Sequence, residues 1–222
     1  MQYKTKGIIL KRTNLGEADR ILTILTESRG KIKAVAKGVR KTLSKLAGHL
    51  ELFCYVNLVI AEGKNLDIIT AAEIKKCFIK LRGDLKKTNI AYYLAEIIEQ
   101  MTAENEKHPE IFDLLTQVLE HLNNGQDKLL LVYFEINFLA ESGFKPELNN
   151  CLSCRHKVIA GENYFSLSEG GIVCPKCKNH DIRISDSAVK VLRLFLKHRI
   201  SVIQKIKTDK ILFENEIELL SY

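Results

Sequence analysis

Four cysteines in the last third of the chain constrain its fold more than any other feature. Cys151 and Cys154 form one C-x2-C pair, and Cys174 and Cys177 form a second pair after 19 intervening residues. Each such turn can hold two sulfur atoms about 3.5 to 4 Å apart, the edge of a tetrahedron around a zinc ion. The spacing predicts one structural zinc ion, because four thiolates leave no open coordination position for catalysis.

The segment between the two pairs must bring them together. Asn163–Leu167 and Ile172–Val173 are predicted strands around the turn Ser168-Glu169-Gly170-Gly171, and this hairpin would return Cys174 to Cys154. His156 and His180 lie close enough in sequence to replace a cysteine, although a surface position is the simpler expectation. Two disulfides or an iron–sulfur cluster are the alternatives to zinc.

The chain of 222 residues, 46% hydrophobic, is long enough for an ordinary globular core. Its apolar runs are shorter than the roughly 18 to 20 residues that span a bilayer, and its N-terminus does not resemble a secretory signal. We expect a cytoplasmic protein without a membrane partner. Cys54 and Cys77 stand alone in apolar stretches and are predicted to be buried small hydrophobic residues.

Charge divides the chain into basic and acidic parts. Residues 1–82 carry 17 Lys/Arg against 7 Asp/Glu, residues 83–149 carry 5 against 12, and residues 150–222 carry 12 against 8. A basic block of this density is typical of an anion-binding face, and a solubilising lysine-rich surface is the alternative.

The basic block is predicted to be a small β-barrel. Five short runs rich in β-branched residues are separated by turn signals: Lys4–Leu10, Arg20–Thr26, Lys31–Lys37, Leu52–Ala61 and Leu66–Ala72. Lys41–Leu50 is predicted to be a short helix between the third and fourth strands. This order is that of an OB-fold, although other small barrels share it.

Helical periodicity begins at Asp84. Two apolar stripes, Ala91 to Met101 and Ile111 to Leu122, precede an almost wholly apolar helix over Asp127–Ser142. A helix over Ser187–His198, capped by Ser185 or Asp186, and a last helical stretch to Tyr222 follow the cysteines. We therefore expect an α+β protein: an N-terminal five-stranded OB-fold barrel (1–80), a C-terminal helical domain (83–146 and 185–222) and an inserted four-cysteine zinc-binding lobe (147–184).

A track of cations runs through the third strand into the following turn. Lys31, Lys33 and Lys37 alternate along the strand and should project from one face. The candidate DNA-binding residues are Arg12, Arg20, Arg29, Lys31, Lys33, Lys37, Arg40, Lys41 and Lys45. Polyphosphate binding requires such a track, whereas a lysine-protected strand edge is the structural alternative.

Several motifs in this region resemble a known family. Gly16-Glu17-Ala18-Asp19-Arg20-Ile21-Leu22, Ala36-Lys37-Gly38-Val39-Arg40-Lys41 and Ser44-Lys45-Leu46 resemble the N-terminal signature of RecO, the bacterial recombination mediator. Downstream, Phe134-Glu135 and Gly143-Phe144-Lys145-Pro146-Glu147-Leu148 are similar to a second RecO landmark. The resemblance covers nearly the whole chain.

The resemblance implies an OB-fold, a helical domain and a zinc-binding insert. It also implies binding of single- and double-stranded DNA, annealing of complementary strands, and work in the bacterial cytoplasm at the nucleoid. RecR and the C-terminal tail of the single-stranded-DNA-binding protein are the implied partners, in loading RecA onto coated DNA. A receptor for an acidic tail with a hydrophobic end needs an apolar pocket with a basic rim. Lys190, Arg193, Lys197 and Arg199 are candidates for the rim, or simply the solvated side of a helix.

Aromatic content constrains how DNA would be held. OB-folds that grip single strands stack bases on aromatic rings, yet residues 1–82 contain only Tyr3, Phe53, Tyr55 and Phe78, and the chain has no Trp. We expect phosphate contact to dominate, which makes binding sequence-independent, indifferent to strandedness and steeply salt-dependent.

Two other functions are weighed against this one. An enzyme would need clustered carboxylates or a phosphate-binding loop, but the acidic residues are scattered and Gly38-Val39-Arg40-Lys41-Thr42 lacks the first glycine of a P-loop. We expect a protein that is not an enzyme. A zinc-ribbon or OB-type RNA-binding or ribosome-associated protein would account equally for the charge and the cysteines.

Overall fold

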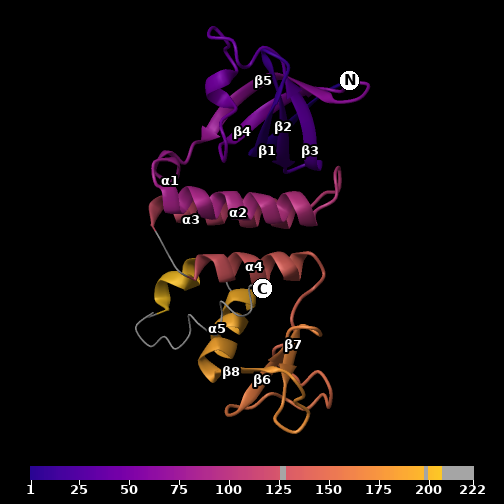
Figure 1. The fold of residues 1–222 in the computed structure, drawn as a ribbon, viewed down its shortest axis with the longest axis vertical. Helices are drawn as coiled ribbons and strands as arrows, with labels where there is room; N and C mark the ends of the chain where they lie inside the picture. Colours follow the sequence, from indigo (N-terminus) through magenta and orange to yellow (C-terminus); the bar gives the residue numbers. More distant parts are fainter. Residues whose placement is uncertain (126–128, 198–199, 207–222) are drawn as a thin grey trace. The chain divides into compact units, whose positions relative to one another are not determined.

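The computed structural model describes residues 1–125, 129–197 and 200–206 (Figure 1). Contacts divide the chain into two compact units, Met1–Gln126 and Asp127–Tyr222. The first unit joins five β-strands to three helices, and the second joins the remaining helices to a small three-stranded sheet and the four cysteines. This division differs from the three domains expected from the sequence, whose boundaries remain a prediction about which parts fold on their own.

The first unit is built on a closed five-stranded barrel. Its strands are β1 (Gln2–Leu15), β2 (Asp19–Thr26), β3 (Gly30–Ala36), β4 (Tyr55–Ala61) and β5 (Asp67–Lys76). They close in the order β1-β2-β3-β5-β4, with β1 pairing again with β4 and a short parallel contact between β3 and β5. The five predicted strands and the predicted OB-fold are therefore confirmed.

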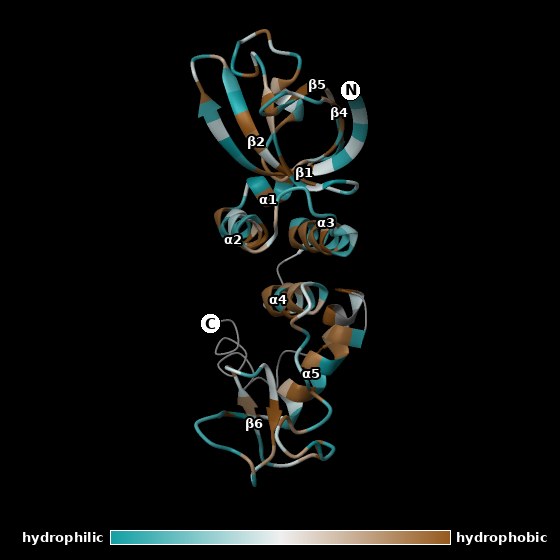
Figure 2. Ribbon diagram, turned by 90° about the vertical axis from the view of Figure 1, so that its right-hand side faces the viewer, coloured by the Kyte–Doolittle hydropathy of each residue, from teal (hydrophilic) through white to brown (hydrophobic). Residues whose placement is uncertain are grey.

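Alternating apolar side chains build the barrel core. Ile9, Leu22, Ile24, Ile32 and Leu58 are all at most 3% exposed, and Figure 2 shows hydrophobic segments interleaved with hydrophilic ones along the strands. Gly7 lets β1 approach its neighbours, because a Cβ there would lie 2.6 Å from Cγ2 of Ile24. The long β1 bends at an irregularity in its pairing with β2 between Ile9 and Lys11.

Three helices complete the first unit: α1 (Ile79–Arg82), α2 (Leu85–Met101) and α3 (Pro109–Asn124). The carboxylate of Asp84 accepts hydrogen bonds from the Lys86 and Lys87 N–H groups, which fixes the start of α2. The two predicted apolar stripes are buried, except that Met101 at the end of the first is exposed.

The predicted helix over Lys41–Leu50 is wrong. Turns closed by hydrogen bonds between residues three apart run from Gly38 to Leu46, and only Ala47–His49 forms a short 3-10 helix. Lys41 and Lys45 would repel each other four residues apart on a helix, and Ser44 competes for backbone hydrogen bonds. The segment is therefore a folded loop.

The second unit contains α4 (Leu130–Glu141), α5 (Asp186–Lys197) and the 3-10 helix η2 (Ile200–Lys205). Between α4 and α5 lies a small sheet of β6 (Asn163–Ser166), β7 (Gly171–Val173) and β8 (Ile182–Ile184), ordered β7-β6-β8. The β6–β7 hairpin was predicted and β8 was not. The predicted helical stretch to Tyr222 lies outside the described residues beyond position 206.

Two further observations concern the chain as a whole. Cys54 and Cys77, expected as separate buried residues, are paired as a disulfide, although Cys54 is indeed buried. They face each other because Tyr55 pairs with Lys76 in the antiparallel β4–β5 ladder, so Cys54 and Cys77 are the next pair.

Among the described residues, no helix combines the length and apolarity required to cross a bilayer.

Candidate metal centre and nucleic-acid surface

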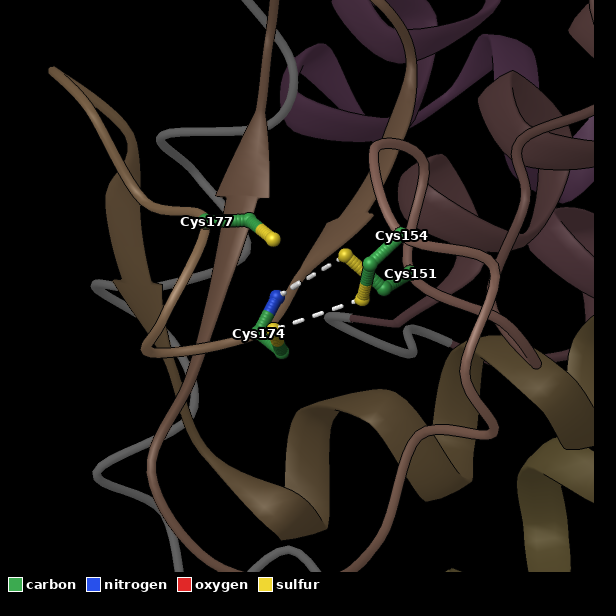
Figure 3. A group of neighbouring side chains, drawn as sticks. All are labelled: Cys151, Cys154, Cys174 and Cys177. Carbon is green, nitrogen blue, oxygen red and sulfur yellow. Dashed lines mark hydrogen bonds between the residues drawn. The ribbon is translucent and has the colours of Figure 1, made fainter.

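The four predicted cysteines meet within one lobe of the second unit, residues 147–184. Cys151 and Cys154 lie on a turn closed by the Arg155 N–H, which donates to the Cys151 carbonyl at 2.9 Å. Cys174 follows β7, and a matching turn is closed by the Cys177 N–H to the Cys174 carbonyl at 3.0 Å. Figure 3 shows the four side chains pointing into one common space.

The sulfur positions fit one metal ion. All four sulfur atoms lie within 4.8 Å of one another, and Sγ of Cys154 lies 3.8 Å from Sγ of Cys174. These spacings are close to the edge of a sulfur tetrahedron. His156 and His180 are exposed and stand outside this four-sulfur group. The four-cysteine set is thus positioned to bind a metal ion.

Local hydrogen bonding prepares the site for a cation. Burial opposes ionisation of the Cys151 thiol, but the N–H groups of Cys154, Cys174 and Ser153 outweigh it and lower its pKa to about 6. Hydrogen bonds with Cys174 and Cys154 raise the pKa of Cys177 to about 12. Adjacent sulfur anions therefore oppose one another's ionisation, and a bound cation would offset this opposition.

The lobe is tied to the helices of its own unit. Glu147 runs beside the start of β7: its N–H donates to the Gly170 carbonyl at 3.1 Å, and its carbonyl accepts from Ile172 at 2.8 Å. Arg193 of α5 donates through Nε to the Leu148 carbonyl at 3.0 Å. These bonds explain why the lobe and the helices form one compact unit.

The nine cations predicted to bind DNA fall into three groups. Lys31 is buried. Arg12, Arg29 and Lys33 form ion pairs with carboxylates. Of the remaining five, Arg20 lies at the start of β2 and the other four lie on the loop between β3 and β4; all are at least partly exposed and have no carboxylate partner among the described residues. We call these five residues the loop surface: Arg20, Lys37, Arg40, Lys41 and Lys45.

Backbone contacts hold the loop surface together. The Arg40 N–H donates to the Ala18 carbonyl at 2.9 Å, and Nη1 of Arg40 donates to the Gly16 carbonyl at 3.0 Å. The carboxylate of Asp19 accepts from the Gly38 N–H at 2.7 Å. Gly38 has φ of 64°, a left-handed conformation that glycine adopts without strain. These bonds hold the segment after β3 against the β1–β2 turn, close in the chain to Arg20 at the start of β2.

The three paired cations belong to a different environment. Arg12 bonds Glu51 at 2.8 Å, Arg29 bonds Glu62 at 3.0 Å and lies over the Tyr3 ring, and Lys33 contacts Glu104. Charge counting along the chain does not find these partners, because each carboxylate comes from a loop distant in sequence. A phosphate would have to compete with them for the cations.

Lys31 requires a correction. The sequence predicts that Lys31, Lys33 and Lys37 project together from one strand face, but only Lys33 and Lys37 are exposed. Lys31 is 5% exposed, and its Nζ donates to the carbonyls of Glu99 and Thr102 at the end of α2. Burial lowers its pKa, against the opposing effect of nearby carboxylates. Lys31 binds the end of a helix, and we no longer assign it to DNA.

Aromatic rings of the barrel are already in contact with other side chains. Phe53 and Tyr55 pack edge-on against Tyr92 of α2 and Phe112 of α3, with ring centres 5.1 and 5.7 Å apart. Arg29 covers the ring of Tyr3, and Phe78 is buried. Residues 1–82 are all described, and each of their four aromatic rings is either buried or in contact with another side chain.

The second unit also has an apolar groove beside the lobe. A cavity of about 200 Å³ is lined by Ile136 and Leu139 of α4, Phe144, Phe165 and Leu192 of α5, among others. Phe144 is 71% exposed. Of the four cations considered for a basic rim, Arg193 is bonded to the backbone, Lys190 and Lys197 are exposed, and Arg199 lies outside the described residues.

Taken together, the closed barrel, its helices and the four-sulfur group define a class: OB-fold proteins that carry a lobe with four cysteines positioned to bind a metal ion. Two family models match the chain, Recombination protein O N terminal over residues 1–78 and Recombination protein O C terminal over residues 82–214. The chain therefore belongs to the RecO family of DNA repair proteins.

Curated relatives agree with this assignment. A DNA repair protein RecO of Dehalococcoides mccartyi is 44% identical over 220 residues, which are 98% of this chain and 87% of the relative. Those of Roseiflexus and Bacillus pumilus are 38% and 35% identical, over 86% and 88% of this chain and 69% and 77% of their own lengths. The predicted family is confirmed.

Proposed function

We propose that this protein is a non-catalytic mediator of DNA repair and homologous recombination. It binds single- and double-stranded DNA without sequence preference, anneals complementary strands and, with RecR, helps to load RecA onto DNA coated by the single-stranded-DNA-binding protein. The observation that carries the DNA-binding part is the loop surface, five cations that form no ion pair with a carboxylate in the part of the chain that the structure describes. Membership of the RecO family supports the rest, including work in the bacterial cytoplasm at the nucleoid.

Phosphate contact suits an annealing protein. A protein that stacks bases must release them before they can pair, whereas cations on the phosphates leave the base edges open. With every barrel ring already in contact, the loop surface supplies charge alone. Binding of this kind releases counterions, so its affinity falls by about 0.9 log units per log of salt for each phosphate neutralised.

Salt titration of DNA binding tests this proposal. Replacing Lys37 and Lys41 by Gln should weaken binding to single and double strands alike and make the salt slope about 2 units shallower. Lys75→Gln, an exposed lysine of β5, is the matched control and should change the slope less. A double variant with the slope of the unchanged protein would contradict the assignment of the loop surface.

Annealing tests the mediator role. Two complementary oligonucleotides, each coated with the cognate single-stranded-DNA-binding protein, should anneal faster when the protein is added, and faster still with RecR. Direct competition between RNA and single-stranded DNA separates this role from RNA binding. No acceleration of annealing by a protein that binds DNA normally would reject the mediator role.

We further infer that the apolar groove of the second unit receives the tail of the single-stranded-DNA-binding protein. Such a tail ends in hydrophobic residues, which match the groove, and its acidic residues would meet Lys190 or Lys197. Phe144→Ser should reduce binding of a tail peptide by at least about tenfold, since a buried aromatic anchor typically contributes 2 kcal/mol or more. Unchanged peptide affinity would place the tail elsewhere.

The metal is proposed to be a single structural zinc ion. Cys151, Cys154, Cys174 and Cys177 would hold it, and a closed sulfur shell supplies a cross-link without an open position for substrate. Metal analysis of protein purified without chelators should find one zinc per chain. If the analysis found iron, or if the four cysteines formed two disulfides and held no metal, zinc would be rejected. Purified protein should also show no turnover of nucleotides or DNA.

A further inference from the structure

Cys54 and Cys77 occupy facing positions on two strands of the barrel. Cys54 precedes β4, Cys77 follows β5, and their Cα atoms lie 4.7 Å apart, within the range of about 4.4 to 6.8 Å that a disulfide requires. The pair closes the end of the β4–β5 ladder just before α1. Backbone movement is therefore not needed for the two sulfur atoms to bond.

The two cysteines differ in their surroundings. Cys54 is fully buried in the barrel core, whereas Cys77 is partly exposed at its edge. Nη2 of Arg82 lies 3.1 Å from Sγ of Cys77, and Nη1 of the same group faces Glu51 at 3.7 Å. A guanidinium beside a partly exposed sulfur stabilises the thiolate, which is the reactive form of cysteine. Cys77 has the surroundings of an attacking thiol, and Cys54 those of its internal partner.

We propose that Cys54 and Cys77 form a reversible thiol–disulfide pair that responds to hydrogen peroxide. Thiols are normally kept reduced in the cytoplasm, which is the proposed location of this protein. A pair that forms a disulfide only on oxidation is consistent with both that location and the bonded geometry. Thiolate Cys77 attacks one peroxide oxygen, the O–O bond breaks, and the other oxygen leaves as water after taking a proton. Sγ of Cys54 then attacks the resulting sulfenic acid, and the S–O bond breaks as a second water departs. Reduction by a dithiol returns two thiols.

Oxidation of the two cysteines would cross-link the barrel at the point where β5 leads into α1. The Phe53 N–H donates to the Ile9 carbonyl and the Ile9 N–H donates to the Cys54 carbonyl, at 2.9 and 3.3 Å, so Cys54 is bonded directly to β1. Cys77 lies one residue before Phe78, the residue that begins α1. The disulfide therefore joins β1 and β4 to the β5–α1 junction. It should slow local unfolding in which these strands separate from that junction.

The test begins with the full-length, zinc-loaded protein after reduction. Hydrogen peroxide should produce a peptide in which Cys54 and Cys77 are joined, two hydrogen atoms lighter, while dithiothreitol restores both thiols. Oxidation should raise the melting temperature by roughly 5 to 10 °C and slow hydrogen exchange at the Ile9 and Phe53 amides. Peptide mass spectrometry distinguishes this pair from the four metal-binding cysteines.

Variants test the assigned roles. In Cys54→Ser, or in Cys54→Ala if the serine variant folds poorly, a 1,3-dione probe should trap Cys77 as its sulfenic acid. Arg82→Gln should slow this trapping roughly fivefold, and Lys80→Gln, an exposed cation on the same helix, should not. The proposal is overturned if both thiols persist in peroxide, or if the disulfide of the folded protein resists dithiothreitol. It is also overturned if the probe does not trap Cys77, or if the two charge variants have equal effects on trapping.

Discussion

Lys31 and Lys41 carry the same charge in different surroundings. Lys31→Met removes two hydrogen bonds to carbonyls at the end of α2 and should destabilise the first unit by about 1 to 3 kcal/mol. Lys41 is exposed, so Lys41→Met should change stability by less than about 0.5 kcal/mol while weakening DNA binding. Urea denaturation and DNA titration of both variants measure the two effects.

The two lysine variants control each other. DNA affinity of folded Lys31→Met should match that of the unchanged protein, because the Lys31 side chain is buried and its ammonium group donates to carbonyls at the end of α2. Loss of DNA affinity in Lys31→Met at an unchanged denaturation midpoint would contradict the structural role.

Glu147 makes the lobe sensitive to acid. The N–H groups of Asn149 and Asn150 donate to its Oε1 at 2.7 and 3.0 Å and lower its pKa. The folded state thus favours the carboxylate more than the unfolded chain does. The resulting stability is complete above the unfolded pKa and is lost as the pH falls through the lower folded pKa.

Glu147→Gln should therefore cost about 1 kcal/mol near pH 7, and the difference should shrink as the pH falls through the lowered folded pKa of Glu147. Glu169→Gln, an exposed carboxylate of the same lobe, is the matched control and should have no such effect. Metal loss at acid pH affects both variants alike, so the difference between their unfolding curves isolates Glu147. A difference that persists undiminished at pH 3 would contradict this explanation.

Sequence patterns located the four-cysteine group and the cation-rich loops, because both depend on close spacing along the chain. They did not locate the partners of Lys31 and Arg12. The carbonyls of Glu99 and Thr102 lie 68 and 71 residues from Lys31, and only the docking of α2 on β3 brings them together. Charge along a strand indicates which residues are cationic, but not which of them another element covers.

The β2–β3 turn and the α2–α3 loop depend on one glycine. Gly30 has φ of 69°, and a Cβ there would lie 1.6 Å from the Glu106 carbonyl oxygen. Gly16, in the β1–β2 turn, has φ of 55° but open space around it. Gly30→Ala should destabilise the protein by more than about 2 kcal/mol, and Gly16→Ala by about 1 kcal/mol. Equal denaturation midpoints for the two variants would show that the α2–α3 loop can move away from a Cβ at position 30 without cost, which would contradict this prediction.

Elements with a strong pattern were predictable, and short ones were not. The five barrel strands combine β-branched residues with glycine turns, and α3 has an apolar residue at nearly every turn. Strand β8 has three residues and exists because β6 offers it a free edge. The Lys41–Leu50 segment contains apolar residues at helical spacing, but like charges and a central glycine, Gly48, oppose a helix.

Removal of the metal should affect the two units unequally. Replacing Cys174 by Ser, or treating the protein with a strong chelator, should destabilise the lobe by several kcal/mol. The loop surface belongs to the other compact unit, so DNA binding should persist. Hydrogen exchange resolved by peptide, together with DNA titration, measures both outcomes. Lost DNA binding in a variant whose exchange is unchanged would make the lobe a contact surface.

The four-cysteine lobe cannot be exchanged as a self-contained module. Its first segment accepts a hydrogen bond from Arg193 of α5 at the Leu148 carbonyl, and Glu147 continues the chain from α4 into the edge of β7. If residues 147–184 were replaced by those of a relative, the Arg193 guanidinium would face a different loop in place of the Leu148 carbonyl that it now bonds. Chimaeras in this family should therefore tolerate the exchange only when α5 travels with the cysteines.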